Sequence, residues 1–522
     1  MHLTLLLRFR TKLESKELRN LCPTGRGLAA KRDPKRLPVC MFKIALVPFA
    51  AALASSTPAA FRSSVASAPA SAGPASVAAV LSNLQWPSGG PPPDFAVLTV
   101  PQEHADSLHS FSDEIARKIS ARILIGVLGQ AIGAGKEFDQ EPGLSLIAGT
   151  LPVGTAITPF VVSESRMPSL STFDDGGEDR ARPGFLVFAD PYSAVSQVAS
   201  LLNELCPSSV VAGGLSCPIS DSSPSLALFE NGVCRALPTG SLIGVRLAGP
   251  NFEMHSCTAQ GAAPVGPSFV VTKGDGNLVT ELDGQPALER LQEVARAAAR
   301  EEGGERVVKL LQRALLVGSS IEIDETDEID ETDEVGSAAG ADSDGLDDAQ
   351  GSRRVPVVAD GEPDFLIRGV LGADSKGGLY IGDRVTPGKS RVRFHCRDGQ
   401  AAHEELTVLL QRYRLTRQFS GRFDGERSRP LGCMLFSCNG RGRRMYAPTA
   451  GAEVSYTVAD HDSTVIREAT VRDLPIGGFF CNGELGPLGV KGVSAPLAEG
   501  SVNTYLHGFT SVVAFFYDTT ER

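Results

Sequence analysis

The chain has 522 residues, of which 42% are apolar, and a formal net charge of −11. The charge is uneven, because residues 322–348 carry thirteen Asp and Glu and no Lys or Arg, so the rest of the chain is close to neutral. These values predict a soluble globular protein of two or three domains, and they exclude an extended basic face for nucleic-acid binding outside the N-terminal tail.

The N-terminal segment up to Pro93 is predicted to be a targeting leader without a fixed fold. Its first forty residues are basic, and a second start, Met41, precedes an apolar stretch, Ile44–Leu53, that is too short to span a bilayer. Ser, Ala and Pro then dominate, without acids, and Phe61 marks the predicted cleavage point. Two interpretations fit. One is a two-part plastid leader, as in algae with complex plastids; the other is a disordered leader with a misassigned start, which leaves the protein cytoplasmic.

Residues 94–250 are predicted to form the first folded domain. The expected strands are 95–100, 123–128, 144–149, 156–162, 185–189, 210–214, 225–229 and 241–247. Helices are expected over 107–120 and 193–205, because apolar residues recur there at helical spacing. The repeated strand, helix, strand order predicts an α/β fold with mixed sheets flanked by helices, built from a duplicated half-domain.

A glycine-rich segment, 129–136, follows one of these strands and was compared with phosphate-binding loops. Lys136 is followed by Glu137 and not by Ser or Thr, so the P-loop pattern fails. We expect these glycines to let the backbone cross the end of the sheet closely.

Residues 251–518 are predicted to form a second mixed α/β domain. Its expected strands are 268–272, 278–282, 365–370, 379–381, 392–396, 433–436 and 475–480, and 503–517 is expected to close the sheet. Its expected helices begin at Pro286 and cover 401–413 and 460–468. An acidic insertion, 318–362, is expected to be a disordered, solvated loop. Calcium binding is the alternative there, although the glycine and the spacing of an EF-hand are absent.

Two strands of this domain end in the same Cys-Asn-Gly sequence, followed by opposite charges. Asn-Gly readily turns a chain, so two such strands in one sheet would hold Arg441 and Glu484 over one hollow with bare glycine amides between them. A guanidinium can bond both oxygens of a carboxylate, while a glutamate accepts from an ammonium group. The pattern predicts a receptor for a small zwitterion; two ordinary surface turns are the alternative.

Several segments also carry a family resemblance as an ordered set. In the C-terminal half these are 271–273, 281–288, 432–442, 477–487 and Leu506-His507-Gly508-Phe509-Thr510. They resemble the C-terminal domain of the FIST family. Upstream, 125–133, 144–146, 211–214 and 244–247 are similar to the FIST N-terminal domain, and the resemblance covers residues 94–518.

The resemblance implies a non-enzymatic sensory module that binds a small molecule such as an amino acid. The family also includes F-box proteins, in which the FIST part recruits targets for ubiquitination, so a scaffold with a protein partner is the alternative. No F-box is found before Asp94 and no signalling segment after Tyr517, which predicts a sensor part standing alone. The predicted ligand-binding residues are Asn439, Gly440, Arg441, Asn482, Gly483, Glu484 and His507.

His507 has three interpretations. It fits a hydrogen-bonded core histidine, and it fits an axial haem ligand, since the resemblance extends to haem-binding gas sensors. It could also serve as a base for a thiolate at Cys438 or Cys481. No C-x-x-C-H sequence is present and no spacing brings these groups together, so we expect no cofactor, no bound metal and no catalysis.

Overall fold

The computed structural model describes residues 59–87, 89–164, 168, 182–301, 303–320, 365–419, 429–448, 454–488, 493–494 and 503–520. These residues form four β-sheets with helices packed on them, in agreement with the predicted mixed α/β class. Two short 3-10 helices, η1 (Ala70–Ala72) and η2 (Gln102–Ser107), precede α2 and α3. No helix in this part of the chain is both long and apolar enough to cross a membrane.

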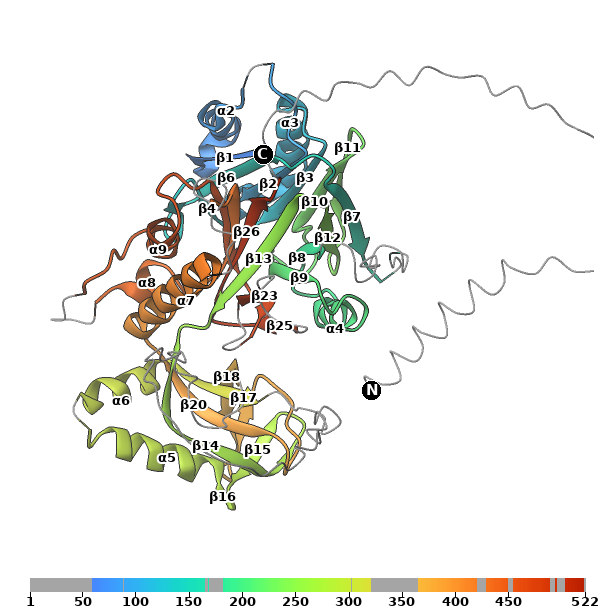
Figure 1. Cartoon of the computed structure of the whole chain (residues 1–522). Coiled ribbons are helices and arrows are strands. Elements are labelled where there is room, and N and C mark those ends of the chain that lie inside the picture. Colours follow the sequence, from blue (N-terminus) through green and yellow to red (C-terminus); the bar gives the residue numbers. More distant parts are fainter. Residues whose placement is uncertain are drawn as a thin grey trace, which may run out of the picture. The chain divides into compact units, whose positions relative to one another are not determined.

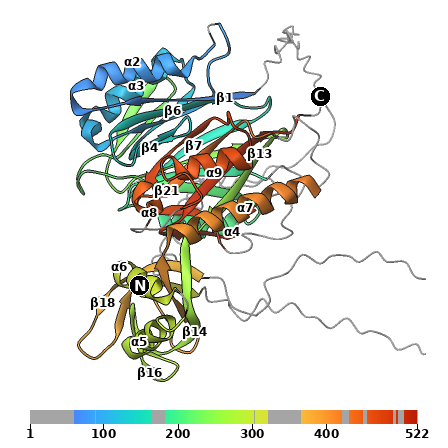
Figure 2. The same ribbon diagram turned by 90° about the vertical axis from the view of Figure 1, so that its left-hand side faces the viewer.

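Sheet one has the strand order β1-β6-β2-β3-β10-β11. Its strands are β1 (Ala60–Ser67), β2 (Phe95–Val100), β3 (Ile123–Leu128), β6 (Gly143–Thr150), β10 (Leu226–Glu230) and β11 (Val233–Leu237). The helices α2 (Gly73–Leu84) and α3 (Leu108–Lys118) lie over one face of this sheet (Figure 2). They bury an aliphatic stripe there, which includes Val77, Val80 and Ile115.

The position of β1 and α2 corrects the prediction that residues up to Pro93 are an unfolded leader. β1 pairs with β6 along its whole length, from Ala60 opposite Thr150 to Ser67 opposite Gly143. Phe61, at the predicted cleavage point, is only 6% exposed and stacks on Phe516. Alanine and serine are typical of transit peptides, but they also suit a strand and a helix that pack closely. The predicted leader before residue 59 lies outside the described residues.

Sheet two has the order β25-β23-β9-β8-β12-β7, and sheet three the order β24-β13-β26-β21-β22-β4-β5. The strands of sheet two are β7 (Ala156–Val162), β8 (Gly184–Ala189), β9 (Val210–Leu215), β12 (Leu242–Ala248), β23 (Glu484–Pro487) and β25 (Thr504–His507). Those of sheet three are β4 (Gln130–Gly133), β5 (Lys136–Glu137), β13 (Phe252–Ala259), β21 (Gly432–Cys438), β22 (Ile476–Cys481), β24 (Val493–Ser494) and β26 (Ser511–Asp518). Helix α4 (Val195–Leu205) packs on sheet two, whereas α7 (Gly399–Phe419) and α9 (His461–Ala469) pack on sheet three.

Each of these three sheets contains one parallel pair of strands whose connection includes a helix. The pairs are β2 and β3 through α3, β8 and β9 through α4, and β21 and β22 through α9. After each pair the chain enters a different sheet, where β4 pairs with β22, β10 with β3 and β23 with β9. The predicted boundary at residue 250 therefore does not separate independent sheets. The inner faces share one core, in which Phe188, Phe436 and Phe479 are in contact.

The chain crosses closely at Gly129, as predicted. A Cβ atom there would lie 2.9 Å from the ring of Phe479, so a side chain would collide with the core.

Sheet four has the order β14-β20-β17-β18-β19-β15-β16. Its strands are β14 (Ala262–Asp275), β15 (Leu278–Leu282), β16 (Gln285–Pro286), β17 (Leu315–Ser320), β18 (Phe365–Ala373), β19 (Leu379–Ile381) and β20 (Arg391–Arg397). The helices α5 (Ala287–Ala298) and α6 (Gly304–Arg313) pack on it (Figure 1). The predicted acidic insertion begins too early at 318, because β17 continues to Ser320; residues 321–364 lie outside the described residues.

Candidate functional site

The two Cys-Asn-Gly sequences lie side by side. β21 and β22 are parallel neighbours with Cys438 opposite Cys481, which confirms the expectation that both strands belong to one sheet. The Nδ2 atom of Asn439 donates to Oδ1 of Asn482 at 2.7 Å, and both side chains are exposed at the end of the sheet. The structure thus brings the two predicted asparagines together.

Arg441 turns inward and is only 2% exposed. Its guanidinium bonds both oxygens of Asp462, with Nε 2.9 Å from Oδ2 and Nη2 3.2 Å from Oδ1. The hydroxyl of Tyr446 accepts from Arg441 and donates to Asp462 at 2.7 Å. The guanidinium that was predicted to bind the carboxylate of a ligand therefore binds the carboxylate of Asp462.

Asp462 is the centre of this buried polar network. It also accepts from the hydroxyl of Ser437 at 3.1 Å and from Nδ1 of His461 at 2.9 Å. Burial alone would raise the pKa of Asp462, but Arg441 and the hydrogen bond from His461 hold it well below its usual range. Both members of the pair are ionised and buried, and each has an opposite charge as its partner, as a buried charge requires.

Glu484 is also fully buried, and it makes no hydrogen bond or ion pair with Arg441 in the described structure. Its Oε2 accepts from the backbone N and the hydroxyl of Thr510, at 3.2 and 2.8 Å, while Oε1 has no partner. Burial raises the pKa of Glu484 to about 8, more than these bonds lower it. Gly483, just before it, is buried and accepts from the backbone N of Leu215 at 2.8 Å, where the chain crosses from sheet three to sheet two.

This pKa predicts a specific dependence of stability on pH. The ordinary value is 4.5, so between about pH 5 and 8 the folded protein holds a proton on Glu484 that the unfolded chain has released. The free energy of unfolding should fall as pH rises through this window, by up to about 1.4 kcal/mol per unit. Glu484→Gln lacks this loss, so its melting temperature should rise relative to the wild type from pH 5 to 8. A difference between the two proteins that is constant with pH would contradict the prediction.

His507 is 3% exposed, and its Nε2 donates to the carbonyl of Gly486 at 2.9 Å. Burial lowers its pKa to about 4. It makes no hydrogen bond to either cysteine in the described structure, and burial raises the pKa of both Cys438 and Cys481. Across the described residues, no three His, Cys, Asp or Glu side chains are grouped so as to hold a metal ion.

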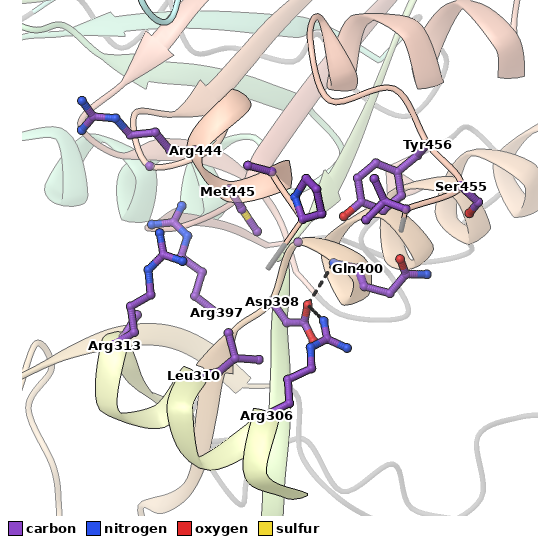
Figure 3. A pocket seen from close by; sticks show the side chains of 16 residues that line it. Arg306, Leu310, Arg313, Arg397, Asp398, Gln400, Arg444, Met445, Ser455 and Tyr456 are labelled. Carbon is purple, nitrogen blue, oxygen red and sulfur yellow. Dashed lines mark hydrogen bonds and ion pairs between the residues drawn. The ribbon is translucent and has the colours of Figure 1, made fainter. Parts of the chain in front are cut away.

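An open cavity of about 720 Å³ lies at Gly440, and we call it the arginine pocket (Figure 3). It is bounded by the end of α6, the junction of β20 with α7, and the short helix α8 (Arg443–Tyr446). Its charged lining residues are Arg306, Arg313, Arg397, Asp398 and Arg444. Apolar contacts come from Leu310, Met445 and Pro448, so the pocket combines several charged groups with some hydrophobic surface.

Arg397 is held in place by groups that carry no negative charge. A Cβ atom at Gly440 would lie 2.0 Å from its Nη1, so a larger residue at this position would displace the guanidinium from the turn. Its Nη2 is 3.8 Å from the sulfur of Cys438, and its Cζ lies 5.2 Å above the ring of Phe509, a cation–π contact. Phe509 has a φ of 69°, which is unusual for a bulky residue, and such strain is concentrated at functional sites.

The charges in the pocket do not balance. Nη2 of Arg306 lies 2.7 Å from Oδ1 of Asp398, which neutralises both. Within the described residues Arg313, Arg397 and Arg444 have no carboxylate partner. Figure 3 shows Arg313 and Arg397 extending into the same part of the pocket from α6 and from the end of β20. The pocket is therefore suited to an anion.

The sequence predicted one residue at this pocket but not the arginines that characterise it. Gly440 was predicted and lines the pocket, whereas Arg397, Arg313 and Phe509 were not predicted. A usable signal was Arg397-Asp398-Gly399, where charged residues end a buried strand and precede a helix. Arg313 carried no local signal, because only the packing of α6 on sheet four places it there.

Comparisons with known proteins find two matching family models. Residues 94–285 match the FIST N domain, and residues 332–487 match the FIST C domain. An uncharacterised protein of Mycobacterium tuberculosis (strain ATCC 25618 / H37Rv) is 32% identical over 436 residues, which are 82% of this chain and 92% of that protein. An uncharacterised protein of Mycobacterium bovis is 29% identical over 435 residues, 83% of this chain and 92% of its own length.

Proposed function

The chain belongs to the FIST family, with a FIST N domain followed by a FIST C domain, and we propose that it is a non-enzymatic sensory module that binds a small carboxylate-bearing ligand in the arginine pocket. FIST domains are associated with sensory and signal-transduction roles. An amino acid is the simplest ligand of this kind, and the pocket is its proposed site, in place of the buried residues Arg441 and Glu484.

The observation that carries the proposal is the state of Arg397. Its guanidinium lies against Gly440, Cys438 and Phe509, yet no carboxylate of the described structure forms an ion pair with it. A binding group that is already ordered costs little entropy when a ligand arrives. A planar guanidinium in this state suits the two oxygens of a carboxylate.

The same pocket offers a partner for an ammonium group. Asp398 uses Oδ1 for Arg306 and for the backbone N of Gln400, at 2.7 and 3.0 Å. Its Oδ2 makes no hydrogen bond within the described residues, so it remains for a ligand. The apolar side chain of an amino acid would then contact Leu310 and Met445.

Helix α8 gives a route from the pocket into the core. Arg444 and Met445 line the pocket, and the next residue, Tyr446, bonds both Arg441 and Asp462. A ligand that shifts α8 therefore acts directly on the buried ion pair. This connection supports a sensory role, since a local contact would alter the packing of sheet three.

Thermal-shift measurements with a panel of amino acids test the proposal. At a concentration 100-fold above Kd, a ligand should stabilise the protein by about 2.7 kcal/mol. Arg397→Gln should lose this shift. Arg296→Gln, on the exposed face of α5 and outside the pocket, removes the same charge and should keep it. The absence of a shift with any amino acid, or an equal shift in Arg397→Gln, would contradict the proposal.

A further inference from the structure

We infer that the ligand of the arginine pocket carries two anionic groups, one bound by Arg397 and the other by Arg313. This inference rests on the proposed function and specifies its ligand class. A dicarboxylate and a phosphorylated small molecule share this chemistry.

The first argument is the balance of charge. A neutral amino acid brings one carboxylate, which Arg397 can take, and an ammonium group, which Asp398 can take. Arg313 would then still face the ligand without a negative partner. Adjacent like charges in a partly enclosed site repel, and a second anion removes that repulsion.

The second argument is the separate origin of the arginines. Arg313 is the last residue of α6 and Arg397 the last of β20, so two elements each supply one cation. A lysine or arginine near a helix C-terminus is favoured by the helix dipole alone, which accounts for the presence of Arg313 but not for its direction. Figure 3 shows its side chain extending into the pocket beside that of Arg397.

The third argument is size. A cavity of about 720 Å³ is large for a single carboxylate with a short side chain, and it lies in the range that encloses whole small molecules. Two anions at opposite ends of such a ligand can reach different arginines. Guanidinium groups bind carboxylate and phosphate equally well in geometry, so the two sources must be separated by experiment.

Isothermal titration calorimetry of the full chain with matched probes tests the inference. L-glutamate and L-glutamine differ by one carboxylate, and O-phospho-L-serine and L-serine differ by one phosphate. In at least one pair, we expect the probe with the second anionic group to bind about tenfold more tightly than the probe without it, because a charged hydrogen bond is gained. Whichever pair shows the larger ratio identifies carboxylate or phosphate.

Variants locate the second anion. Arg313→Gln should reduce the ratio within the favoured pair towards one, while the neutral probe binds as before. Arg296→Gln should leave the ratio unchanged. If a variant fails to fold, the comparison of probes on the wild type still tests whether the pocket binds a second anionic group.

The possible results distinguish a failure of this inference from a failure of the proposed function. Equal affinities within both pairs would overturn the inference and leave the proposed function standing. No saturable binding by any of the four probes would overturn the inference, and only a panel of amino acids without any thermal shift would overturn the proposed function as well.

Discussion

Replacing Asp462 by alanine should lower the free energy of unfolding by about 3–5 kcal/mol, the usual cost of removing one partner of a buried ion pair. Arg441 has a fully buried side chain, and Asp462 supplies both of its charged contacts. Without the carboxylate, the guanidinium, the hydroxyl of Tyr446 and that of Ser437 all lose an acceptor. Urea denaturation of the full chain, followed by circular dichroism, measures the effect.

A double substitution distinguishes a buried charge from a simple loss of packing. Arg441→Met combined with Asp462→Leu removes both charges and should be more stable than Asp462→Ala alone, because no unpaired cation is left in the core. The effects of Arg441→Met and Asp462→Leu alone provide the comparison. If the double variant is destabilised relative to the wild type by the sum of these two effects, the two residues are not coupled and the account of this network is wrong.

Gly478→Ala should destabilise the protein about as strongly as Asp462→Ala. Gly478 lies in the middle of β22 with a φ of 153°, and a Cβ atom there would be 1.9 Å from the carbonyl oxygen of Leu435 on β21. The strand must move or the backbone must change, and backbone strain alone costs about 1–3 kcal/mol. With the lost strand contacts we expect about 4 kcal/mol in total. The melting temperature and the soluble yield both report it.

Gly369 on β18 provides the matched control. It is also a strand glycine, but the nearest atom to a Cβ there is Cζ of Phe509 at 4.0 Å, which is ordinary contact. Gly369→Ala should therefore change stability by less than about 1 kcal/mol. If Gly478→Ala is tolerated as well as Gly369→Ala, the close approach of β21 and β22 is not as described.

Many strands of the fold could be predicted because they are local patterns, although β13 and β17 were not predicted. β2, β3, β7 and β19 have the predicted bounds, since each is a short apolar run between turn residues. The exchange of strands between sheets could not be predicted. It depends on which edge each strand reaches after Gly129, Leu215 and Asn482, and no local pattern specifies that.

The candidate site shows the same division. Cys-Asn-Gly followed by a charge correctly indicated two adjacent strand ends, but Arg441 is buried because its counter-ion, Asp462, comes from the start of α9. Glu484 is buried because the chain enters sheet two there. A charged residue after a turn is usually solvated, so only the tertiary structure could reveal that these two face inward and that Arg397 faces the pocket.

A crystal structure of the protein with bound L-glutamate tests the central claim most directly, because it locates the ligand. The account predicts ligand density in the arginine pocket, with one carboxylate against the guanidinium of Arg397 and the Arg441–Asp462 pair intact beneath it. Density between Arg441 and Glu484 in place of their present partners, or a ligand bound away from Arg397, would contradict it.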